Sequence, residues 1–230
     1  MANPSSGKNE PTKITEKLVN FIQNHRKIIL IVSAAVVVVF VGIAAAYIIS
    51  EKAQEKAIAE VEAYYEQYES LRVDLNEPFK EDEVRQFIAS LSEFAGKKSG
   101  YAGARAYYII ADIHADKKEW LEAEHAWVNA AGKAPRIYLA PVSFFNAAVA
   151  AEEQGNSIKA IELYTRALEY ADTFPGAPRA AFSVGRLYEE QRDTEAAVAA
   201  YRNVIEQWPG QNWANLASSR VAAITASGGV

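Results

Sequence analysis

The apolar positions of this chain form one continuous run near the N-terminus and a series of helical faces after it. The run covers Ile28–Ile49, 22 residues without a charged side chain. At about 1.5 Å per residue, a helix of this length spans about 33 Å, which is enough to cross the hydrocarbon core of a bilayer. We therefore predict a transmembrane helix over residues 28–49.

A cleaved secretory signal is the alternative interpretation of this run, because Ala44–Ala46 offers a small-residue cleavage site. The apolar core of a signal is only about 7–15 residues long, so the length of the run favours a permanent anchor. Its flanks predict the orientation, since basic residues concentrate on the cytoplasmic side of a span. Those before the run are Lys8, Lys13, Lys17, Arg26 and Lys27, and only Lys52 and Lys56 follow closely after it. The N-terminus is therefore expected in the cytoplasm, and the remainder outside it.

A helical stalk is predicted after the anchor, over Glu51–Leu71. Its apolar residues alternate steps of four and three, as in a coiled-coil seam. Two heptads are fewer than a coiled coil needs, so docking onto the next helix of the same chain is favoured over self-association. Glu77-Pro78 is expected to end the stalk, and a second amphipathic helix is predicted over Glu81–Ala95. The stalk seam consists of Ala57, Val61, Tyr64, Tyr68 and Leu71.

The later helical faces recur every 37 residues. One series of small residues runs Ala123, Ala160, Ala197, and four positions later an aromatic series runs Trp127, Tyr164, Tyr201. Small residues at one fixed place and aromatic residues at another are typical of helices that cross closely and fill the adjacent space. A fixed period of this length predicts a stack of repeated helix pairs.

The third copy, Pro178–Gly210, resembles a tetratricopeptide repeat. In that motif, small and aromatic residues occupy set positions of two helices and a proline closes the second one. The matching residues are Ala181, Val184, Gly185, Tyr188, Ala197, Tyr201 and Pro209. The period exceeds the usual 34 residues by three, and we place the additional residues between units, at 134–140 and 171–177.

The predicted fold is thus all-α, a single N-terminal transmembrane helix followed by an α-solenoid of three tetratricopeptide repeats with a C-terminal capping helix. The predicted segments are a cytoplasmic basic tail 1–27, the transmembrane helix 28–49, the stalk and pre-repeat helix 50–100, the repeats 101–211 (104–137, 141–174 and 178–211), and the capping helix and tail 212–230. A cap is expected because each repeat buries its apolar face only against a neighbour.

The charge distribution and the missing motifs argue against several classes of function. Residues 1–50 have a charge of +3 and the remainder −8, and an acidic soluble part argues against nucleic acid as a partner. There is no cysteine, and His114 and His125 lack zinc-ligand spacing, so no metal site and no cofactor are predicted. No nucleophile or phosphate-loop motif occurs either. The sequence therefore predicts a protein that is not an enzyme.

The resemblance to tetratricopeptide proteins implies a concave groove lined by the first helix of each repeat. It places one aromatic residue per repeat in that groove, and these residues exceed what the framework requires. The expected partner-binding residues are Tyr108, Phe145, Phe182, Asn146, Arg105, Arg179 and Arg186. Burial of the aromatic side chains under neighbouring helices is the alternative. The lysines of a carboxylate clamp are absent from these positions.

The order of basic tail, anchor, stalk, additional helix and repeats resembles the YfgM-like proteins of the bacterial inner membrane. This resemblance implies an ancillary role at the protein-export translocon, with periplasmic chaperones as partners. The broader prediction is a single-pass inner-membrane adaptor that binds partner proteins through extracytoplasmic repeats. Two alternatives stay open, a structural envelope component that forms homo-oligomers through the stalk and a carrier of small apolar ligands in the groove.

Overall fold

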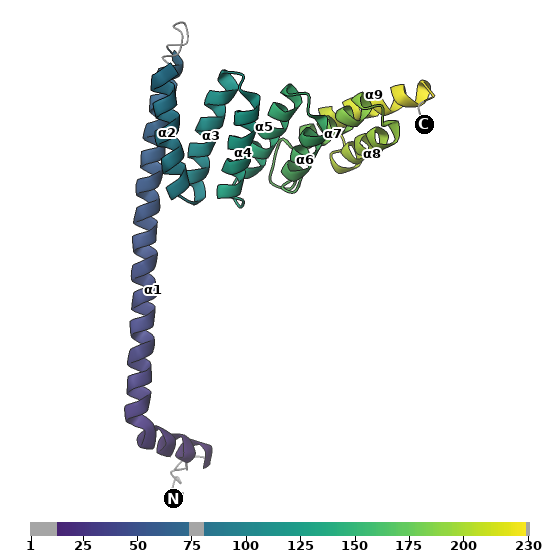
Figure 1. Cartoon of the computed structure of the whole chain (residues 1–230). Coiled ribbons are helices and arrows are strands. Elements are labelled where there is room, and N and C mark those ends of the chain that lie inside the picture. The colour runs from purple at the N-terminus through teal and green to yellow at the C-terminus, as the bar shows by residue number, and fades with distance from the viewer. Residues whose placement is uncertain (1–12, 74–80, 229–230) are drawn as a thin grey trace, which may run out of the picture. The chain divides into compact units, whose positions relative to one another are not determined.

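The computed structural model describes residues 13–73 and 81–228, and over these residues every regular element is an α-helix (Figure 1). The predicted all-α fold is therefore confirmed. The helices are α1 Lys13–Val73, α2 Glu81–Lys97, α3 Gly100–Asp116, α4 Trp120–Lys133, α5 Leu139–Glu153, α6 Ser157–Leu168, α7 Ala177–Glu190, α8 Thr194–Gln207 and α9 Asn212–Ala226. The first twelve residues of the predicted tail and the predicted break at Glu77-Pro78 lie outside the described residues.

The chain divides into two compact units, Met1–Glu55 and Lys56–Val230. In the first unit, α1 contains the predicted apolar run, and the side chains of residues 28–49 are all exposed. Among the described residues, α1 is the one helix long and apolar enough to cross a membrane. A helix with an uncovered apolar surface along its whole circumference is typical of a segment whose solvent is lipid.

In the second unit, the C-terminal part of α1 packs against α2. Val61 is completely buried and Tyr68 almost so, in one core cluster with Leu91 of α2. The ring of Tyr64 meets the edge of Phe87 of the same helix at 5.9 Å between centroids. The apolar seam of the stalk thus docks onto the chain's own next helix, the arrangement that its short length favoured.

Three helix pairs follow, α3/α4, α5/α6 and α7/α8, each stacked on the one before it (Figure 1). Ala123, Ala160 and Ala197 are fully buried where the second helix of each pair crosses the first. The adjacent aromatic residues, such as Tyr164 and Tyr201, are also buried. The 37-residue period of the sequence therefore corresponds to one helix pair of the stack.

The turn inside each pair contains one residue in the left-handed backbone region, again every 37 residues. These residues are Lys118 (φ 59°), Gly155 (φ 72°) and Arg192 (φ 63°). A left-handed residue just after a helix reverses the chain direction and stops the helix. The chain uses glycine at only one of the three turns, so the turns were predictable from the repeat register rather than from glycine alone.

Helix α9 packs on α8 and α7 at the end of the stack. Its residues Ala217 and Ile224 are buried on the side that faces the stack, whereas Asn215, Ser218 and Ser219 are exposed. A polar outer surface at the last helix shields the stack from further association. This is the capping helix that the sequence predicted.

Candidate functional site

Each predicted groove aromatic packs against the second-helix aromatic of its own repeat. The pairs are Tyr108 with Trp127, Phe145 with Tyr164, and Phe182 with Tyr201, with ring centroids 6.4, 5.3 and 5.3 Å apart. All three groove aromatics are half-buried. They therefore belong partly to the framework, and part of each ring remains accessible from outside.

Two of the predicted site residues bond to each other across the first two repeats. The side-chain amide of Asn146 donates a hydrogen bond of 2.8 Å to the hydroxyl oxygen of Tyr108. Burial, followed by the nearby charge of Asp112, raises the pKa of Tyr108 to about 12. The hydroxyl therefore stays neutral at physiological pH.

Two of the predicted arginines lie over aromatic rings. The guanidinium carbon of Arg105 is 4.2 Å from the ring centroid of Tyr65, and that of Arg179 is 5.1 Å from the ring centroid of Phe145. In the part of the chain that the structure describes, neither forms an ion pair with a carboxylate. The Nε of Arg105 is buried without a hydrogen-bond partner among the described residues, whereas Arg179 is exposed to solvent and keeps its hydrogen-bond donors available.

The third arginine, Arg186, is bound to carboxylates instead. It pairs with Glu152 of the preceding repeat and donates a 2.5 Å hydrogen bond to Glu190 on its own helix. Glu152 also accepts a 2.6 Å hydrogen bond from the hydroxyl of Tyr164. One carboxylate thus joins both helices of the second repeat to the first helix of the third.

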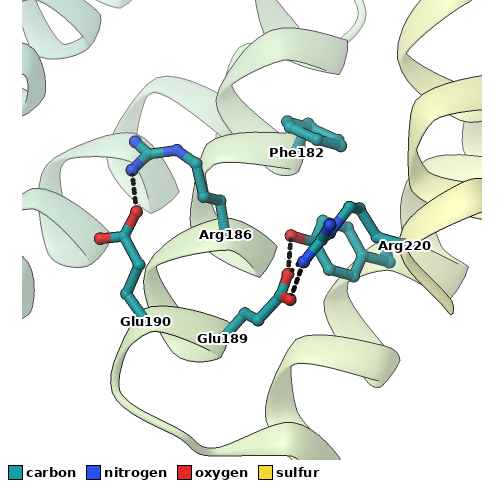
Figure 2. Close-up of a pocket in the computed structure, with 6 residues that line it drawn as sticks. Phe182, Arg186, Glu189, Glu190 and Arg220 are labelled. Carbon is teal, nitrogen blue, oxygen red and sulfur yellow. Dashed lines mark hydrogen bonds and ion pairs between the residues drawn. The ribbon is translucent and has the colours of Figure 1, made fainter. Parts of the chain in front are cut away.

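The same arrangement recurs one repeat later, as Figure 2 shows. Glu189 accepts a 2.9 Å hydrogen bond from Tyr201 and pairs with Arg220 of α9. The hydrogen bond from Arg220 lowers the pKa of Glu189 below its usual value. Helix α9 therefore occupies the place of the first helix of a further repeat.

A cavity of about 490 Å³ opens between α7, α8 and α9, and it contains two of the predicted residues, Phe182 and Arg186 (Figure 2). Its other lining residues are Glu189, Glu190, Tyr201 and Arg220. The walls combine two aromatic side chains, Phe182 and Tyr201, with carboxylates and guanidinium groups that already pair with each other. Such a surface suits a polar peptide better than a purely apolar ligand.

Sequence reasoning missed the carboxylates Glu152 and Glu189 as inter-repeat links. A signal was present, because both the glutamates and their tyrosine partners, Tyr164 and Tyr201, are separated by 37 residues. No group of metal ligands occurs within the described residues, and His114 bonds instead to Glu119 at 2.6 Å.

Comparison with known proteins finds similarity to a family model, a curated relative and a solved structure. Residues 145–212 match a family model described as "Tetratricopeptide repeat". A TPR repeat-containing protein of Treponema pallidum (strain Nichols) is 45% identical over 132 residues, which make up 57% of this chain and 55% of the relative's own length. The chain thus spans about half of that relative. The solved Arabidopsis OM64 TPR domain aligns with 53% of this chain and 95% of its own, at 18% identity and a TM-score of 0.42.

The family model covers α6, α7 and α8 completely and most of α5. It ends at Asn212, where α9 begins. Together with the 45% identity to a protein described by the same repeat, this match agrees with the buried register of Ala123, Ala160 and Ala197. The chain contains tetratricopeptide repeats.

Proposed function

We propose that this protein is a membrane-anchored adaptor whose repeats bind a partner protein outside the cytoplasm. The observation that supports the binding role best is the pair of stacked arginines, Arg105 and Arg179, which form no ion pair in the described part of the chain. Charged groups without internal partners contribute little to the fold, and interfaces are enriched in arginine and aromatic residues. Repeats of this family act as protein-interaction scaffolds, which supports the same role.

The proposed binding surface comprises the accessible faces of the three groove aromatics and the residues next to them. Its members are Tyr108, Phe145, Phe182, Asn146, Arg105, Arg179 and Arg186. Arg186 is the least available of these, because Glu152 and Glu190 already neutralise it. We therefore assign partner recognition mainly to Arg105, Arg179 and the aromatic rings beside them.

An ancillary role in protein export follows from the resemblance to YfgM-like proteins, and we propose it as the specific pathway. The rival role, an oligomeric envelope component, depends on a free stalk seam. That seam is occupied by α2 at Val61 and Tyr68, so the contacts favour an adaptor over self-association through these residues.

Reversing the charge of one exposed arginine tests the binding surface. Arg179→Glu is expected to reduce capture of the partner from detergent-solubilised membranes about ten-fold or more, because it replaces attraction by repulsion at the proposed contact. Arg202→Glu changes the same charge on an exposed position of α8 and should capture the partner like the natural protein. If Arg179→Glu and Arg202→Glu capture the partner equally well, the partner does not bind at Arg179 and the neighbouring Phe145.

A reporter fusion tests the anchor and its orientation. A reporter enzyme active only outside the cytoplasm, fused after Val230, is expected to be active, and the fusion should remain in the membrane fraction after alkaline washing. The reason is the excess of lysine and arginine before the apolar run. Activity together with release into the soluble fraction would instead identify residues 28–49 as a cleaved signal.

A further inference from the structure

A second cavity, of about 280 Å³, lies between α6, α7 and α8 and shares no lining residue with the cavity of Figure 2. Its apolar walls include Leu168, Ala181, Val184 and Trp208. Exposed polar, uncharged side chains, Asn203 and Gln207, stand among its lining residues. The proposed partner-binding surface does not use this cavity.

The repeat register explains why this space is empty. The position of Ala181 is occupied by Tyr107 in the first repeat and by Phe144 in the second. A cation covers each of these two rings. Lys133 lies 5.9 Å from the ring centroid of Tyr107, and Arg166 lies 4.0 Å from that of Phe144. The first two repeats thus supply both a ring and its cover.

The third repeat has neither the aromatic ring nor the cation at the equivalent positions. Asn203 replaces Arg166 at the equivalent position, and Gln207 replaces Tyr170, whose ring lies 6.5 Å from that of Phe144. All three replacements, including alanine for Phe144, line the cavity. The space that remains therefore corresponds to an aromatic side chain that the earlier repeat provides from its own sequence.

We propose that this cavity binds the phenylalanine side chain of a partner polypeptide. The evidence for the shape is Phe144, whose buried benzyl group fits the equivalent site of the second repeat, beside Tyr170 and Arg166. The absence of any charged residue from the lining disfavours a charged group there. The amides of Asn203 and Gln207 provide both donors and acceptors for the main chain on either side of the inserted ring.

The test uses the full chain in detergent, labelled with 5-fluorotryptophan, and N-acetyl-phenylalaninamide as the probe. We expect a saturable shift of the fluorine signal of Trp208, which lines the cavity, while the signals of Trp120 and Trp127 stay in place. Each signal is assigned by replacing one tryptophan at a time with phenylalanine. N-acetyl-alaninamide, which lacks the ring, should leave all signals unchanged.

Two variants close the site in different ways. Ala181→Phe restores the ring of the earlier repeat, and Asn203→Arg restores its cover at an exposed position that leaves the core unchanged. Each is expected to weaken the probe about ten-fold or more. Ala222→Phe adds the same ring at an exposed position of α9 outside the cavity and should bind the probe normally.

The proposal is wrong if Trp208 shows no saturable shift up to the solubility limit of the probe. It is also wrong if Asn203→Arg binds as well as the natural protein, whether or not Ala181→Phe folds. The outcome is independent of the adaptor proposal, because Arg179→Glu removes none of the residues that line this cavity and should leave the shift intact.

Discussion

Gly185→Leu is expected to destabilise the repeats by about 3 kcal/mol, the upper end of the usual cost of overpacking. Gly185 lies where α7 crosses α8, and a Cβ atom there would stand 2.7 Å from two ring carbons of Tyr201. That ring is completely buried, and its hydroxyl is bonded to Glu189, so moving the ring costs both its packing and this bond. The larger side chain must therefore separate the two helices.

The measurement is a thermal melt of residues 56–230, the second compact unit. A loss of this size lowers Tm by about 6–12 °C in a domain of this length. Gly132→Leu is the matched control, because Gly132 is an exposed residue inside α4 with no atom within 4 Å of its would-be Cβ. The control should melt at or slightly above the natural temperature, since leucine favours a helix more than glycine does. Equal melting of both variants would contradict the assigned register.

Val61→Asp is expected to detach the stalk from α2, at a cost of about 3–5 kcal/mol, typical of a buried charge without a partner. Val61 has no exposed surface and lies in the core cluster that also contains Leu91 and Phe94. Among these apolar side chains a carboxylate finds no hydrogen-bond donor. The helix segment from residue 56 onward should therefore leave α2, and the apolar face of α2 should become accessible.

Amide hydrogen exchange measures this effect, and the expected result is faster exchange along α2 and residues 56–71, with α7 and α8 unchanged. Contacts in a stacked solenoid run mainly between neighbours, so the loss should remain local. Ala59→Asp places the same charge on an exposed position of the same helix and should exchange like the natural chain. If Val61→Asp instead changed only the oligomeric state of the full chain, the seam would be an intermolecular contact.

Several features were determined by the sequence alone, because they depend on local periodicity. The 22 uncharged residues of Ile28–Ile49 predict a helix long enough to cross a bilayer, and α1 contains them. The alanines at 123, 160 and 197 and the aromatic residues four positions later record where helices cross, since a larger residue at those places would not fit. Helix boundaries were less well determined. The first repeat was predicted to begin at residue 104, whereas α3 begins at Gly100.

Other features were decided only by the tertiary structure. Glu152 reads in the sequence as one of two adjacent solvated carboxylates, yet it bonds to Tyr164 and Arg186, which lie 12 and 34 residues further along the chain. The sequence left open whether the groove aromatics are accessible or buried, and the tertiary structure packs each of them against a second-helix ring while leaving it half-buried. In the sequence, Ala181 is one of several small residues that match the repeat motif. It marks a cavity only because Asn203 and Gln207, brought beside it by the packing of α7 and α8, are too short or too polar to fill the space that Phe144 fills one repeat earlier.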